Sequence, residues 1–198
     1  YTLDNQGNCW LTSTRGIYKL SFFPHTYNLV HIDNGFETRA FLCDNEKRLW
    51  VSSKAQMIRV YQPDGQLEGY LTPQGKISKD KQSFTSVYCF LEDHEGNIWI
   101  GTNNGLSCYH PTENRFTNYT KQDGLPDTQF YWNASCHSSD GTLYFGTVAG
   151  LTAIESNFPP SIIQPANVRF TKLRIGNQDI LPGNICLLYT SPSPRDRG

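Results

Sequence analysis

The chain has 198 residues, of which 37% are hydrophobic and 13% aromatic, enough apolar material for the core of one or two β-rich domains. Its formal net charge is −1 and it has no run of basic residues, so a nucleic-acid-binding groove is not expected. No stretch approaches the roughly 18 apolar residues of a membrane span, and no signal peptide is recognisable. Because the first residue falls inside a predicted strand, we expect a piece of a larger protein.

The chain begins with a unit that recurs. Residues 3–22 contain Asp-x-x-Gly-x-x-Trp followed by a Gly-aliphatic pair that starts another strand. Residues 42–63 repeat the pattern, with Lys47 and Gln56 at the two positions where the other copies have turn glycines. We therefore expect the turns of this second copy to follow a different path. The polar stretch at residues 72–83 is typical of a solvated loop.

The third copy is the clearest. Aromatic and β-branched residues predict strands at 86–93, 97–102, 106–110 and 115–120, and Gly, Asn and Pro separate them. Residues 138–154 form a fourth copy, in which Tyr144 replaces the tryptophan. The aromatic anchors are spaced 40, 49 and 45 residues apart, which is the period of a four-stranded propeller blade; they are Trp10, Trp50, Trp99 and Tyr144. The sequence thus predicts an all-β fold, a partial β-propeller of about four blades over residues 1–158, with the anchors packed between sheets.

The pattern then changes. Pro159, Pro160 and Pro165 indicate a stiff connector, and alternating apolar and polar residues up to position 180 predict a hairpin that turns at Gly176 and Asn177. We interpret residues 159–185 as a linker and the first strands of a truncated β-sandwich. Residues 186–198 resemble the translation of a transposase adaptor used in sequencing-library preparation. We predict that this tail is not native and exclude it from the reasoning on fold and charge.

Neither the cysteines nor the histidines form a metal-ligand pattern. The six cysteines show no C-x-x-C spacing, and the five histidines supply no paired ligands, so no metal and no cofactor is predicted. Most of the cysteines fall in or beside predicted strands, where free Cys behaves as a small apolar residue. A single disulfide between blades stays open for an oxidising compartment.

Aligned in this way, the chain resembles the two-component regulator propeller repeats of hybrid two-component systems from gut anaerobic bacteria. Three stretches carry the resemblance: residues 93–111, residues 123–154, and the Pro-Pro linker into VRFTKLRIGNQDI. The resemblance implies the last blades of a periplasmic sensor region, followed by an immunoglobulin-like domain with a triple-tyrosine signature. It also implies a homodimeric parent with a membrane helix, a histidine kinase and a DNA-binding regulator, all outside these residues. In such a parent the propellers sense a glycan fragment, the sandwich relays a change in dimer geometry, and genes for polysaccharide use are switched on.

A sensing role directs attention to the links between blades, where aromatic and planar polar residues together favour sugar binding. The best candidate is the stretch PDTQFYWN, with Asp127, Gln129, Tyr131 and Trp132. Regular alternation along an inner strand would bury every second one of these residues, so blade packing is the competing interpretation. Arg39 and Tyr88 are weaker candidates for the same oligosaccharide ligand.

Two alternatives remain open. Some propellers are glycan lyases or hydrolases, and Asp93 with His94 or Glu95 could be an acid and base pair. These residues occupy a repeated turn whose counterparts are Asp4, Asp44 and Ser138, so repetition explains them without catalysis and no enzyme is predicted. The other alternative is a propeller that binds proteins, which no residue excludes.

Overall fold

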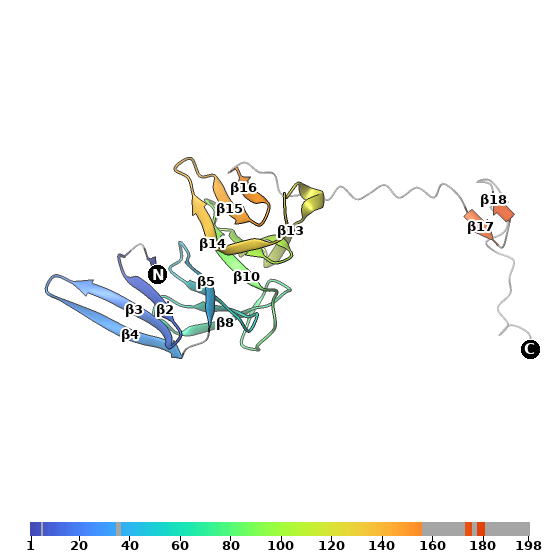
Figure 1. Ribbon diagram of the computed structural model, residues 1–198. Helices are drawn as coiled ribbons and strands as arrows, with labels where there is room; N and C mark the ends of the chain where they lie inside the picture. The colour runs from blue at the N-terminus through green and yellow to red at the C-terminus, as the bar shows by residue number, and fades with distance from the viewer. Residues whose placement is uncertain (5, 35–36, 156–172, 176–177, 181–198) are drawn as a thin grey trace, which may run out of the picture. The chain divides into compact units, whose positions relative to one another are not determined.

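The computed structural model describes residues 1–4, 6–34, 37–155, 173–175 and 178–180. Clustering of contacts divides the chain into two units, residues 1–161 and 162–198. The first unit contains four successive antiparallel sheets, each from one continuous segment of the chain (Figure 1). The prediction of an all-β fold built as a partial propeller is therefore confirmed.

The four sheets share an up-and-down strand order. The first sheet is β1-β2-β3-β4 and the third is β10-β11-β12-β13, as expected for blades of four strands. The second has a fifth short strand, β9, and three strands of the fourth lie within the described residues. The bounds are β1 Thr2–Leu3, β2 Cys9–Ser13, β3 Gly16–Phe23, β4 Thr26–Asn34, β5 Thr38–Cys43, β6 Leu49–Ser53, β7 Ile58–Tyr61, β8 Leu67–Leu71, β9 Ile77–Ser78, β10 Val87–Glu92, β11 Ile98–Thr102, β12 Gly105–His110, β13 Arg115–Tyr119, β14 Phe130–His137, β15 Leu143–Thr147 and β16 Gly150–Ile154.

Strand β9 corrects the expectation of a plain loop at residues 72–83. The backbone N–H of Gly75, at φ +80°, donates to Thr72 O, and Thr72 N–H donates to Lys76 O at 2.8 Å. This tight turn lets Ile77 pair with Leu71 and extend the sheet. Pro73 and Gly75 are turn residues that the sequence displayed. Lys79, Asp80 and Lys81 beyond the strand are exposed, as a solvated loop requires.

The turns of the second blade differ from expectation at one of two places. Lys47 adopts φ +66° and its N–H donates to Asp44 O, the bond that Gly96 makes to Asp93 O in the third blade. The first turn therefore keeps its path despite the side chain. The second turn does change, because it holds one residue more: Trp50 pairs with Val60, ten positions on, whereas Trp99 pairs with Cys108, nine positions on.

The cores lie between consecutive sheets. Trp10 packs with Leu49 and Val51 of the second sheet, and Trp50 packs with Ile98 and Ile100 of the third. Trp99 packs with Leu143 and Phe145 of the fourth sheet, while Tyr144 is only half-buried. A blade thus buries its anchor against the back of the next blade, and the repeat cannot be stable as a single sheet.

The second unit shows one pairing: β17 (Leu173–Ile175) runs antiparallel to β18 (Gln178–Ile180), with Ile175 opposite Gln178. This agrees with the predicted hairpin strands. The proline connector, the predicted turn residues and the tail at 186–198 lie outside the described residues, so the sandwich and the adaptor stay predictions. Among the described residues, no helix is both long and apolar enough to cross a membrane.

Candidate ligand-binding site

The first strands of the second, third and fourth blades are interrupted near their starts. Strand β10 lies between β5 and β14 (Figure 1). The ladder of β5 skips Arg39, and that of β10 skips Tyr88. In β14 the four residues 131–134 lie between the partners of Thr147 and Phe145, opposite a single residue, and Asn133 has φ +50°. A β-bulge re-aims the side chains of a strand, so three blades present side chains from the same point of the repeat.

The side chains from these bulges meet. The Tyr88 and Trp132 rings stack with centroids 6.3 Å apart and planes inclined by 17°. The Arg39 guanidinium carbon lies 5.6 Å from the Tyr88 centroid and 5.5 Å from that of Trp132. We call these three residues, each from a different blade, the bulge cluster. Trp132 remains 63% exposed, which leaves most of a large flat apolar surface facing solvent.

The other predicted site residues behave differently. Tyr131 is 56% exposed beside Trp132 in the same bulge. Asp127 lies outside the cluster contacts: its Oδ1 accepts from Thr128 N–H at 2.7 Å and pairs with Lys121 Nζ at 3.2 Å. The hydrogen bond from Thr128 N–H, followed by the bond from Lys121, lowers the pKa of the Asp127 carboxyl. The carbonyl of Gln129 accepts from Val148 N–H, which ties the link to the β15–β16 turn.

The structure thus unites Arg39 and Tyr88, the weaker candidates, with Trp132. Regular alternation, the expectation that weighed against residues 126–133, is wrong here because the bulge exposes Tyr131, Trp132 and Asn133 in succession. The sequence signals the β14 bulge only through Gly146, the residue opposite it. A Cβ at this position would lie 2.9 Å from Ala134 Cβ, so the bulge requires glycine there. At Ala40, the N–H released by the bulge in β5 donates to Ser52 Oγ at 3.0 Å.

A separate groove of about 550 Å³ lies along the third blade. Its polar lining comes from hydroxyl and amide side chains, including Ser107 and Asn118, whose side chains bond at 2.7 Å. Phe84 and Phe116, with centroids 5.6 Å apart, form its apolar part. None of the bulge-cluster residues lines this groove, so the two surfaces can be tested independently.

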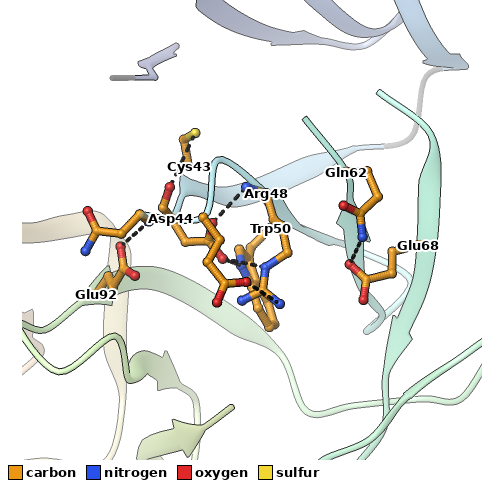
Figure 2. A network of polar contacts seen from close by, with 9 residues as sticks. Cys43, Asp44, Arg48, Trp50, Gln62, Glu68 and Glu92 are labelled. Atoms are coloured by element: carbon orange, nitrogen blue, oxygen red, sulfur yellow. Dashed lines mark hydrogen bonds and ion pairs between the residues drawn. The ribbon is translucent and has the colours of Figure 1, made fainter. Parts of the chain in front are cut away.

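The repeated aspartates are engaged in structure. Asp44 Oδ1 accepts from Arg48 N–H at 2.7 Å, and Oδ2 accepts from Trp50 Nε1 at 2.8 Å (Figure 2). Asp93 makes the same two kinds of bond, to Asn97 N–H and to Trp99 Nε1, each at 2.8 Å. In the second and third blades the aspartate therefore couples the turn to the buried anchor, a role that the turn pattern alone did not reveal.

This coupling explains the fourth copy, where serine and tyrosine replace the aspartate and tryptophan together. In the first copy the pattern is incomplete: Asp4 Oδ2 accepts from Asn8 Nδ2, and Trp10 Nε1 has no partner among the described residues. Asp93 is the residue common to both acid and base pairs considered for an enzyme. Its carboxylate is already hydrogen-bonded to the turn backbone and to the indole of Trp99.

The described cysteines are unpaired. Cys9, Cys43, Cys89, Cys108 and Cys136 are all free thiols. Burial raises the pKa of both the Cys43 and Cys89 thiols to about 12, which opposes thiolate chemistry. Within the described part of the chain, no group of three or more His, Cys, Asp or Glu side chains could hold a metal ion.

Comparison with known proteins identifies the repeat. Residues 81–104, which span β10 and β11, match the family model described as the two component regulator propeller. Histidine kinase P4 of Formosa agariphila is 31% identical over 101 residues, covering 48% of this chain and 7% of the kinase. The match to the family model thus lies within the third repeat, and the chain spans only a small part of the length of the curated relative.

Solved structures support the same fold. The extracellular domain described as that of a hybrid two component system from B. thetaiotaomicron matches with a TM-score of 0.57 and 16% identity, covering 76% of this chain and 20% of that one. Virginiamycin B lyase of Staphylococcus aureus matches with a TM-score of 0.51 and 16% identity, covering 81% of this chain and 56% of that one. At this identity the likeness shows the fold alone, which sensors and enzymes share.

Proposed function

We propose that this chain is an extracytoplasmic ligand-sensing part of a two-component sensor and that its bulge cluster binds a saccharide. The carrying observation is the convergence of Arg39, Tyr88 and Trp132 from three blades, through bulges at one point of the repeat. The propeller repeat and the resemblance to a histidine kinase support the sensing role.

The cluster has the chemistry that sugar binding needs. A pyranose ring offers an apolar face of C–H groups, which packs on an exposed indole, and hydroxyls, which bond to planar polar groups. Trp132 supplies the flat surface and Arg39 supplies N–H donors in a planar fork. Because the three residues come from three blades, a ligand that contacts them all would stabilise one arrangement of the blades over others.

The finer parts of the proposal rest on the family resemblance. In a periplasmic sensor, ligand binding here would bias the dimer of the parent protein, the β-sandwich would relay that bias, and the kinase would activate genes for polysaccharide use. Such a relay needs only a ligand that binds two dimer arrangements with unequal affinity. A propeller that binds a protein instead is the alternative, and it predicts no affinity for saccharides.

Calorimetric titration of the full chain with a panel of neutral and acidic oligosaccharides tests the proposal. We expect at least one saccharide to bind, and Trp132→Ala to weaken it at least tenfold through loss of the stacking surface. Asn118→Ala, which alters the groove on the third blade, is the matched control and should leave the affinity unchanged. Circular dichroism establishes that both variants fold.

Three results would contradict the proposal. Absence of binding across the panel, with a folded chain, would remove the saccharide and favour the protein-binding propeller. Loss of affinity in Asn118→Ala but not in Trp132→Ala would place the ligand in the groove. Release of a cleaved or rearranged sugar during the titration would instead favour an enzyme.

A further inference from the structure

We infer that the bulge cluster is selective for saccharides that carry an anionic group, a carboxylate or a sulfate, and that Arg39 is the specificity-determining residue. The inference rests on the proposed function and deepens it by naming the ligand class. Its basis is the surroundings of Arg39, which has ring contacts where Arg48, Arg59 and Arg115 have ion pairs with carboxylates.

Arg39 has rings as neighbours but no carboxylate. Its guanidinium lies 5.5 to 5.6 Å from the centroids of Trp132 and Tyr88, and no ion pair or hydrogen bond of that group occurs among the described residues. The five N–H donors of the guanidinium have no hydrogen-bond acceptor among the described residues. Those donors are left for solvent or for a ligand.

The other arginines show the ordinary alternative. Arg48 Nε pairs with Asp44 at 2.8 Å, and Arg59 NH1 pairs with Asp33 at 3.1 Å. Arg115 pairs with Glu113 on the same strand and turn. A half-buried arginine without an anionic partner has lost part of its hydration and gained no ion pair in return. A ligand that brings an anion forms a charge-assisted hydrogen bond there, which offsets the desolvation cost.

The nearby carboxylates do not offset the charge of Arg39. Glu37, two residues before it, pairs with Lys54 Nζ at 3.0 Å. Asp127, in the link that leads into β14, pairs with Lys121. The acidic residues described in the two links are thus bonded elsewhere, Glu37 and Asp127 to lysines and Asp123 to Thr120. The cluster therefore presents a positive charge without an ion-pair partner among the described residues.

These features together select the ligand. The Trp132 surface packs on the C–H face of a sugar ring, and the planar fork of Arg39 matches the two oxygens of a carboxylate or sulfate. A neutral sugar satisfies the first contact and offers the Arg39 donors only uncharged hydroxyls. An anionic sugar satisfies both, so we expect it to bind at least tenfold more tightly, which is about 1.4 kcal/mol.

The experiment compares matched ligands on the full chain. Trigalacturonate and a sulfated galactose trisaccharide are titrated beside neutral galactotriose, each at low and at high salt. We expect an anionic trisaccharide to be favoured at least tenfold at low salt, and the preference to shrink as salt screens the charge. Arg39→Gln, whose amide can still donate to sugar hydroxyls, should abolish the preference by weakening the anionic sugar at least tenfold more than the neutral one, and Arg39→Lys should retain part of it.

Arg15→Gln is the matched control, because Arg15 is an exposed arginine of the first blade outside the cluster, and it should change neither affinity. Binding of galactotriose alone, or an equal loss for neutral and anionic sugars in Arg39→Gln, would overturn the inference and leave the proposed function standing. Binding of no sugar by the wild-type chain would overturn both.

Discussion

Glu92 joins two blades through a partly buried carboxylate. Its Oε2 accepts a hydrogen bond from the backbone N–H of Asn45 at 2.8 Å (Figure 2). Burial raises the pKa of Glu92 to about 7; Asp44 and Asp93 act in the same direction, whereas the Asn45 bond and Arg48 oppose it. Because the folded carboxyl holds its proton more tightly than the unfolded one, this group favours folding most at low pH.

The resulting prediction concerns stability against pH. The contribution of Glu92 is fully present below its unfolded pKa, taken as 4.5, and is lost as the pH rises through about 7. In Glu92→Gln, whose amide oxygen can still accept from Asn45, we expect this decline to disappear. Melting temperatures measured from pH 5 to about 8 give the difference between the two chains.

Glu155→Gln, which changes an exposed carboxyl, serves as the control and should follow the wild-type profile. The titration of His110 and His137, whose pKa values burial lowers, is common to all three chains and cancels in the differences. A Glu92→Gln profile parallel to that of the wild type would show that Glu92 titrates normally.

At the scale of the element, the first turn of each blade accepts a positive φ with or without glycine. Lys47 stands at φ +66° where Gly96 stands at φ +81° in the next blade. Both turns make the same backbone bond, so the difference lies in the strain of a side chain in the left-handed region. A Cβ at Gly96 would meet only Glu92 Oε1, at 3.9 Å, so space is not the limit there.

Because the two turns share this geometry, we predict opposite changes in the free energy of unfolding when Lys47 is replaced by glycine and Gly96 by lysine. Lys47→Gly should raise the free energy of unfolding by up to about 1 kcal/mol, because strain in the turn is relieved. Gly96→Lys should lower it by about 1 kcal/mol. Urea denaturation measures both, and changes of the same sign would contradict the shared geometry.

The sequence predicts these elements well where the signal is local. The turn residues, the spacing of Trp10, Trp50 and Trp99, and the apolar runs determine strands and blades, since each depends on neighbours along the chain. The bulge cluster depends on pairing between strands. Nothing within the segments around Arg39 or Trp132 indicates that the ladder skips them, so the meeting of residues 49 and 44 positions apart required the structure.

At the scale of the whole molecule, the outer strands of the first sheet expose apolar residues on its back within the described part of the chain. Leu3, Cys9, Leu20 and Leu29 form one row across β1 to β4. Leu3 is 59% and Leu29 51% exposed, whereas Leu49, the equivalent of Cys9 in the second blade, is fully buried under Trp10. Apolar sheet faces of this kind favour association.

We therefore predict that the chain, as given, associates or has low solubility. Leu29→Lys should shift it toward a monomer, because a charge then lies in the apolar row. Asn28→Lys places the same charge on the opposite face of β4 and should have a smaller effect. Gel filtration with light scattering distinguishes these cases, and a compact soluble monomer of the unchanged chain would contradict the prediction.

The bulges separate two tasks that most strands combine. On either side of each bulge, residues such as Ala40 and Cys89 are buried and hold the blades together, while Arg39 and Tyr88 between the paired positions take no part in the ladder. Ligand preference can thus change in evolution, or by design, through a few positions that the strand ladder does not constrain. A repeat protein with this arrangement can acquire new specificities without having to reinvent its scaffold.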